Sequence, residues 1–297
     1  MKITLRQLEV FTAVATHGQV TRAAQVISMT QAAASMALAD LEQQLGISLF
    51  DRVGRQLLLN DTGRLLLMRA RDVLDQVHDI EAIAHGQDSI FDLHLGASVT
   101  IGNHLLPGLV ANLKHHFPNG QIQISRYNTE QVVAQLLAFR IDMGFIEGPI
   151  EDDRFRRFPW KQDQLIFFAA PQHALVGRLL TTADLSAADW IVREHGSGTR
   201  QVLDQACLSC GVRPRIVLEL EQPEAIRQCV KAGLGIGCLS ELELEDAFRA
   251  GSLVPLSVPF LDMRRNLDVV IHRHKFISRG IAAILGECGI IPGDQVS

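Results

Sequence analysis

At 297 residues, with 47% hydrophobic and 21% charged residues, the chain is too long for one ordinary domain and too apolar for a disordered one, so we expect two or three folded units. No stretch approaches the roughly 18 to 20 apolar residues of a membrane span, and the first residues carry no signal-peptide pattern. The five cysteines, an odd number, do not suggest a disulfide framework. These features predict a cytoplasmic protein with no membrane partner. The net charge of −5 is only weak evidence against nucleic acid, because residues 1–64 hold six Lys and Arg against five Asp and Glu and so carry +1.

Three short helices are expected in the first 46 residues. Apolar residues at spacings of three and four predict a first helix that begins at Leu5 and ends at residues 17–18. Thr21 is expected to cap a second helix over residues 22–27, and Thr30 a third helix that runs to Leu45 and stops at Gly46. The three-residue break between the second and third helices is typical of a helix-turn-helix.

The outer face of the third helix lacks the Lys and Glu of an ordinary solvated face, and instead carries Gln31, Ala32, Ser35, Met36 and Ala39. Small side chains suit insertion into a major groove, where Gln31 could read an adenine edge and the methyl groups a thymine. The alternative is a three-helix bundle that packs on another subunit.

A β-hairpin wing is expected next, from two short apolar runs at 49–52 and 56–59 that flank a Val-Gly-Arg turn. Arginines on this wing can reach the phosphate backbone. The complete set of residues expected to contact double-stranded DNA is Arg22, Thr30, Gln31, Ala32, Ser35, Met36, Arg52 and Arg55.

A long helix is expected from Asp61 to about residue 85. Its apolar residues follow a 4-3-4-3-4 spacing, namely Leu66, Ala70, Val73, Val77, Ile80 and Ala84. This pattern is typical of a coiled-coil seam, and a DNA reader that recognises paired half-sites needs a dimer. We therefore predict a homodimer through this helix; the alternative is a helix packed on its own domain.

The order of these blocks resembles the LysR-type transcriptional regulators. The resemblance is carried by residues 5–11, 21–24, 30–31, 41–46, 49–52 and 62–63. Ala32 and Met36 depart from it, since the family usually has Pro or Ser at the first position and often Arg at the second. The resemblance implies a winged helix-turn-helix domain, promoter DNA and RNA polymerase as partners, assembly into a homotetramer, and no enzyme activity.

The remaining two hundred residues alternate between strand-like and helical runs, which predicts parallel sheets with ligands at the carboxyl ends of the strands. Strands are expected at 91–97, 121–127, 143–147, 190–193, 215–220, 236–240 and 267–272, and helices at 101–117, 132–139, 199–210, 224–232 and near the C-terminus. This half resembles the α/β effector domains of the same family, which share the two-lobed periplasmic-binding-protein fold. The resemblance implies a winged helix-turn-helix domain at 1–60, a linker and dimerisation helix at 61–86, a first effector lobe at 91–161 and 267–297, and a second lobe at 162–266.

Two loops suit a small anion. Each follows a strand and opens a helix, so that hydroxyl groups and free backbone N–H groups converge at a helix N-terminus. A third segment that begins at Glu147 ends a strand at the same edge. Its carboxylate would repel a dianion and favours a hydrogen-bonding, partly protonated or mixed-charge ligand, unless Glu147 pairs with a nearby Arg. The residues expected to bind the effector are Ser98, Val99, Thr100, Glu147, Ser197, Gly198 and Thr199.

These loops are similar to those of one subgroup, the CysL-like regulators, which are tied to sulfite and sulfur assimilation. The resemblance implies a small oxyanion such as sulfite as the effector, with no other cofactor or metal. An organic carboxylate metabolite is the alternative ligand. Two other functions stay open: a thiol redox sensor that uses the C-x-x-C pair Cys207 and Cys210, and an enzyme or solute-binding protein on the same scaffold.

Overall fold

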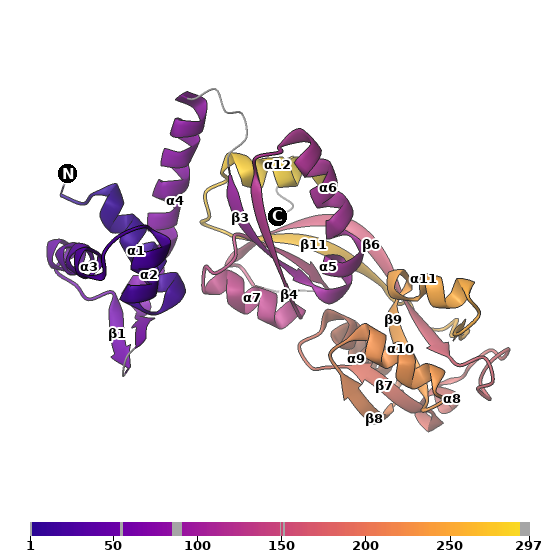
Figure 1. Ribbon diagram of the computed structural model, residues 1–297. Helices are drawn as coiled ribbons and strands as arrows, with labels where there is room; N and C mark the ends of the chain where they lie inside the picture. Colours follow the sequence, from indigo (N-terminus) through magenta and orange to yellow (C-terminus); the bar gives the residue numbers. More distant parts are fainter. Residues whose placement is uncertain (1, 54–55, 85–90, 149, 151, 292–297) are drawn as a thin grey trace.

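The computed structural model describes residues 2–53, 56–84, 91–148, 150 and 152–291. Its N-terminal part consists of α1 (Leu5–His17), α2 (Val20–Val26), α3 (Gln31–Leu45), β1 (Phe50–Val53), β2 (Gln56–Leu59) and the long helix α4 (Asp61–Ala84). Figure 1 shows α4 standing between the three small helices and the rest of the chain. None of the described helices is both long and apolar enough to cross a membrane.

Local capping sets the ends of the first helices. Thr4 and Gln7 form a reciprocal capping box at the start of α1, and Gly18 ends that helix in the left-handed conformation, with φ 68°. Gly46 ends α3 in the same way, as the sequence predicted. The predicted cap at Thr21 is wrong, because α2 begins at Val20, two residues earlier than expected, and Gln19 is its N-cap, without a side-chain hydrogen bond.

The winged helix has its own hydrophobic core, which we call the N-terminal core. Phe11 lies at its centre with an edge-to-face ring contact to Phe50 at 5.7 Å between centroids. The first turns of α4 also belong to it, since Leu67 and Met68 are buried there. The base of α4 is therefore fixed to the winged helix by apolar burial, which is the dominant stabilising contribution in such small domains.

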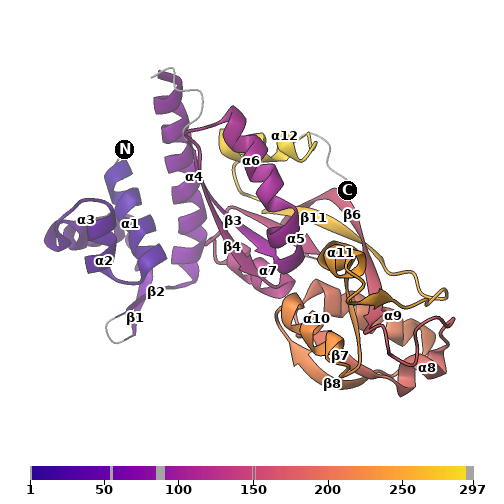
Figure 2. The same cartoon turned by 45° about the vertical axis from the view of Figure 1, so that its right-hand side comes forward.

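The C-terminal part forms two α/β lobes, as the sequence predicted. Lobe I contains β3 (Asp92–Ser98), α5 (Val99–His104), α6 (Leu106–His116), β4 (Gln121–Tyr127), α7 (Thr129–Leu137), β5 (Met143–Glu147), β11 (Arg264–His272) and α12 (Arg279–Glu287). Lobe II contains α8 (Thr182–Ala187), β7 (Asp189–Arg193), α9 (Gly198–Cys210), β8 (Arg215–Leu220), α10 (Pro223–Lys231), β9 (Ile236–Ser240), α11 (Glu241–Arg249) and β10 (Val254–Pro255). Figure 2 shows lobe I between α4 and lobe II.

One strand that the sequence did not predict, β6 (Phe155–Ala169), joins the lobes. Its residues 155–164 pair with β11 and residues 165–168 pair with β9, both antiparallel. The strand order within the described residues is β4-β3-β5-β11-β6-β9-β7-β8, with β10 beside β6. The expected lobe boundary at 161/162 falls inside β6, three residues before this strand changes partners between residues 164 and 165. The expected boundary at 266/267 falls inside β11, near Arg264, which pairs with Gln164.

The parallel strands place the predicted effector-binding loops at the carboxyl ends of strands, as we expected from the sequence. β3 runs parallel to β4 and β5, and β7 runs parallel to β8 and β9. The carboxyl ends of β3, β5 and β7 therefore open toward the region between the lobes. The predicted helix 101–117 is in fact two helices that meet at Leu105, because Pro107 cannot continue the hydrogen-bond ladder of α5.

Candidate DNA interface and effector site

Helix α3 presents the open face that the sequence predicted. Thr30 Oγ1 accepts a hydrogen bond from the backbone N–H of Ala33 at 3.2 Å, which fixes the first turn. Gln31 Nε2 donates to Ser35 Oγ at 3.2 Å along the same face. The exposed residues of this face are Gln31, Ala32, Met36 and Ala39. The face carries small side chains, with polar groups at its leading end, which suits a major-groove reader.

Two of the three arginines predicted to contact DNA lie within the described residues. Arg22 on α2 and Arg52 on β1 are both exposed. β1 and β2 pair antiparallel from Phe50 opposite Leu59 to Val53 opposite Gln56, so the predicted wing is present. Arg55 lies outside the described residues. Contact of these arginines with DNA stays a prediction.

We expect Gln31→Ala to lower the affinity for the cognate site by about 5-fold to 150-fold, the range that one bidentate base contact contributes. Gln44→Ala is the matched control, because Gln44 is exposed in the last turn of the same helix. Fluorescence anisotropy with the DNA upstream of the protein's own gene measures both. Equal affinities for the two variants would show that Gln31 does not read a base.

The long helix α4 offers part of the predicted seam to a partner. Val73 is 40% exposed and Ile80 is 65% exposed, and Val77 is half-buried. The prediction that Ala70 faces a partner helix is wrong, because Ala70 is 2% exposed and packs within the N-terminal core of its own chain. Leu66 also contacts this core. The heptad pattern could not distinguish a residue used by its own domain from one offered to a partner. The side chain of Ala84 lies outside the described residues.

In the C-terminal half the predicted loops converge on Glu147, at the end of β5. Ser98 Oγ donates to Glu147 Oε1 at 2.8 Å, and Thr199 Oγ1 donates to Glu147 Oε2 at 3.2 Å. Ser98 belongs to lobe I and Thr199 to lobe II, so the carboxylate bridges the lobes. The hydroxyl-bearing residues here are each at most 3% exposed, namely Ser98, Thr100, Ser197 and Thr199.

Sequence reasoning missed the arginine that completes this cluster. Arg265 Nη1 donates to Glu147 Oε2 at 2.6 Å, and Arg265 Nε donates to Asp163 Oδ2 at 2.7 Å. Ser240 Oγ donates a hydrogen bond to the other carboxylate oxygen of Asp163, Oδ1, at 2.7 Å. The side chains of the two ion pairs are 1–2% exposed. The possibility that Glu147 pairs with an arginine is therefore confirmed.

The remaining predicted effector residues surround the same point. Gly198, the first residue of α9, lies so close to Glu147 that an added Cβ would be 2.1 Å from the Glu147 carbonyl oxygen. Ser98 and Ser197 are the N-caps of α5 and α9, yet neither side chain caps its own helix. Val99, which follows Ser98, lines a cavity of about 290 Å³ together with Arg126, Tyr127, Asn128, Gln131, Glu194, Glu221 and Gln222.

Glu147 is held ionised. Burial alone would raise its pKa, but the Arg265 guanidinium and the Ser98 hydroxyl outweigh burial and hold the pKa of Glu147 below its usual value. A lowered pKa means that the ionised form stabilises the fold above about pH 4.3, and that this stability is lost as the pH falls through the folded-state pKa.

We therefore expect the free energy of unfolding of Glu147→Gln to fall short of wild type by a margin that is constant near neutral pH and shrinks below about pH 4.3. Urea unfolding of both proteins between about pH 7 and pH 3.5 measures this margin. A margin that does not change with pH would mean that the charge of Glu147 has no role in the cluster.

The C-x-x-C pair does not favour a redox sensor. Cys207 and Cys210 both lie on α9, and burial raises the pKa of the Cys207 thiol to about 12. Thiolate, which is the reactive form, is therefore scarce near neutral pH. Across the part of the chain that the structure describes, no group of three or more His, Cys, Asp or Glu side chains is arranged to hold a metal ion.

Two family models together match almost the whole chain. Residues 5–64 match the model described as "Bacterial regulatory helix-turn-helix protein, lysR family", and residues 92–289 match "LysR substrate binding domain". The chain belongs to the LysR family. It is thus a DNA-binding transcription regulator with a small-molecule effector domain, and not an enzyme.

Relatives and solved structures agree with this LysR-family assignment. The chain is 42% identical to the "Uncharacterized HTH-type transcriptional regulator YeiE" of Escherichia coli strain K12, over 97% of this chain and 98% of the relative. It is 32% identical to CbbR of Rhodospirillum rubrum, over 92% of each chain, and 29% identical to CysL of Bacillus subtilis, over 89% of each. A full-length OxyR variant from Pseudomonas aeruginosa has the same fold, with a TM-score of 0.78 at 20% identity, covering 98% of this chain and 96% of that one. CysL is thus one of several similar regulators and does not by itself define the subgroup.

Proposed function

We propose that this LysR-family regulator senses a small, singly charged oxyanion that carries a proton, of which hydrogen sulfite is the best candidate, between lobes I and II. It binds promoter half-sites through α3 and the wing as a homodimer, with pairs of dimers forming a homotetramer, and acts on transcription by RNA polymerase. The resemblance of its loops to those of CysL-like regulators supports sulfite in particular.

The observation that carries the proposal is the donor-rich environment around an ionised, buried Glu147. The hydroxyl groups of Ser98 and Thr199 point to this carboxylate, and Arg265 Nη1 donates to it. Arg265 Nη2 lies 2.6 Å from Asp163 Oδ2 but is not aligned to donate to it, so this buried donor lacks a hydrogen-bond acceptor in the structure described. A buried donor without an acceptor costs about 1 to 3 kcal/mol, and an oxyanion would remove that cost.

Glu147 also decides which oxyanion fits. An ionised carboxylate accepts hydrogen bonds and repels a second negative charge. Hydrogen sulfite has a proton to donate to Glu147, and sulfite is partly in this form near neutral pH. Sulfate and organic carboxylates without a hydroxyl group are fully deprotonated there and have no such donor. An ionised Glu147 therefore favours sulfite over sulfate, and over a carboxylate metabolite that has no hydroxyl group.

Thermal unfolding of the full chain against sulfite, sulfate, thiosulfate, phosphate and several carboxylates tests this proposal. A ligand at about 100 times its dissociation constant adds roughly 2.7 kcal/mol to the free energy of unfolding, which raises the midpoint visibly. We expect sulfite to stabilise the wild-type protein and the control variant Thr182→Ala, in which the replaced threonine is exposed. Sulfite should not stabilise Thr100→Ala, in which the replaced threonine is buried. Stabilisation by a carboxylate and not by sulfite would contradict the proposed effector.

The homodimer is proposed to form through the exposed apolar side of α4. Leu65, Val73 and Ile80 are 69%, 40% and 65% exposed in the single chain, and they lie at helical spacings of seven and eight. We expect Ile80→Asp to shift the protein toward monomers in sedimentation velocity, because a charge on this seam would be buried without a partner. An unchanged assembly would place the dimer contact elsewhere.

A further inference from the structure

A buried ion cluster ties α4 to lobe I. Lys275, which follows β11, has a side chain that is only 5% exposed. Its Nζ lies 2.9 Å from Asp75 Oδ2 on α4 and 3.2 Å from Asp142 Oδ1 just before β5. Asp72 of α4 lies 3.9 Å from the same Nζ and also accepts the backbone N–H of Phe276 at 3.2 Å. One lysine thus holds three carboxylates from two separate parts of the chain.

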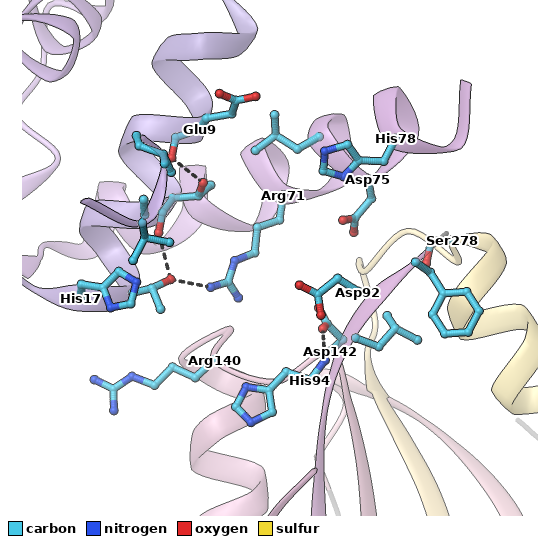
Figure 3. Close-up of a pocket in the computed structure, with 18 of the residues that line it drawn as sticks. Glu9, His17, Arg71, Asp75, His78, Asp92, His94, Arg140, Asp142 and Ser278 are labelled. Carbon is cyan, nitrogen blue, oxygen red and sulfur yellow. Dashed lines mark hydrogen bonds between the residues drawn. The ribbon is translucent and has the colours of Figure 1, made fainter. Parts of the chain in front are cut away.

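The ion cluster borders an open pocket between the winged helix, α4 and lobe I, with a volume of about 590 Å³. Figure 3 shows Asp75 of α4 and Asp142 of lobe I approaching each other across it, with Arg71 beside them. Arg71 Nη2 donates to Thr16 Oγ1 on α1 at 3.2 Å, so the winged helix is linked to the same place. Opening this contact would separate Asp72 and Asp75 of α4 from Lys275, and would leave that lysine with only Asp142 of the three carboxylates.

A strained aromatic residue reinforces the contact. Phe139 follows α7 with φ 52°, in the left-handed region that helix ends normally give to glycine. It is 9% exposed and packs in the N-terminal core, so a residue of lobe I forms part of the core of the winged helix. A side chain is kept at this strained position when its packing outweighs the strain.

Helix α7 connects this contact with the effector site. At its start, Thr129 Oγ1 donates to the Glu147 carbonyl oxygen at 3.1 Å, and Glu130 N–H donates to the Gly196 carbonyl oxygen of lobe II at 3.1 Å. At its end, Phe139 enters the N-terminal core. Between them Val132 and Leu136 are fully buried against the sheet, so the nine-residue helix can move only as a unit.

We propose that α7 and the Lys275 cluster transmit the state of the effector site to the linker helix α4, and so to the DNA readers. The identity of the triggering ligand rests on the proposed function above; the mechanical link does not. Closure of the lobes on an oxyanion moves Glu147 and residue 196, both of which contact the first turn of α7, and α7 carries that movement to Phe139. The ligand binds one arrangement of this contact better than the other, which is the condition for switching.

The test compares Lys275→Met with Lys275→Arg, which keeps the charge, and with Lys161→Met, a control that removes an exposed lysine of β6. Two readouts are measured on the full chain. The first is the ratio of DNA affinities with and without sodium sulfite, at constant ionic strength. The second, taken without any ligand, is hydrogen exchange of the segment 272–278, whose Phe276 amide donates to Asp72 across the contact.

We expect wild type and Lys161→Met to show the same ratio of DNA affinities with and without sulfite. For Lys275→Met this ratio should lie within about 2-fold of one, although the variant still binds DNA and sulfite. Lys275→Arg should recover most of the sulfite dependence of wild type. Lys275→Met should also speed exchange of 272–278 at least several-fold. A full sulfite response in Lys275→Met overturns the link. If sulfite changes nothing in wild type, the proposed effector fails, and the ligand-free exchange still decides: unchanged exchange in Lys275→Met overturns the link as well.

Discussion

Replacing Arg265 with methionine is expected to lower the free energy of unfolding by about 3 to 5 kcal/mol, because removal of one partner leaves buried charges uncompensated. Arg265 is the shared counter-ion of Glu147 and Asp163, and the side chains of both carboxylates are 2% exposed. Two carboxylates that are buried close together without a cation repel each other and lose their hydration. Urea unfolding at neutral pH measures the loss.

The neighbouring Arg264 gives a matched control for this substitution. Its side chain is 70% exposed and pairs with Asp262, which is 62% exposed. Arg264→Met should therefore change the free energy of unfolding by no more than about 0.5 kcal/mol. If Arg265→Met were as mild as Arg264→Met, the buried cluster could not be what holds the two lobes at Glu147.

Gly198→Ala is expected to destabilise the chain by about 1 to 3 kcal/mol or more, and to weaken effector binding at the same time. An added Cβ would lie 2.1 Å from the Glu147 carbonyl oxygen, a backbone atom that cannot rotate away. The helix α9 must then move back from β5, which separates Thr199 from the carboxylate of Glu147. Thermal unfolding with and without sulfite reports both effects.

The same substitution, glycine to alanine, is expected to stabilise the chain at Gly108. It lies inside α6, and a Cβ there would meet no atom within 4 Å. Gly108→Ala should stabilise the chain by about 0.5 to 1 kcal/mol, because alanine loses less backbone entropy in a helix. A stabilising Gly198→Ala would show that the lobes do not approach each other at this glycine.

The parts of the molecule that the sequence predicted well depend on local signals. Thr30 and Gly46 mark the ends of α3 through a hydroxyl cap and a left-handed turn, which need no tertiary partner. Ser98, Glu147 and Thr199 each follow or end a predicted strand, and the carboxyl ends of parallel strands meet at one sheet edge. The convergence of Ser98 and Glu147 was therefore predictable from strand order, whereas that of Thr199 required the two-lobed fold that the family resemblance implied.

The parts that the sequence did not predict depend on long-range contacts. Strand β6 changes partners from β11 to β9 along its length, so its burial follows no single alternation. Arg265 lies beside the exposed Arg264 in a polar run, and only pairing with residues more than 100 positions away shows which arginine is buried. Likewise Ala70 fits a coiled-coil heptad, while the fold uses it in the N-terminal core.

The most direct test of the account is the affinity of the full chain for its own upstream DNA, measured by fluorescence anisotropy with sulfite and, separately, with sulfate. Ionic strength must be held constant, since added salt alone weakens DNA binding. The account predicts that sulfite changes the affinity about 5-fold or more, that sulfate does not, and that Glu147→Gln loses this discrimination. An equal response to both anions, or no response to either, would contradict a sensor built around an ionised Glu147.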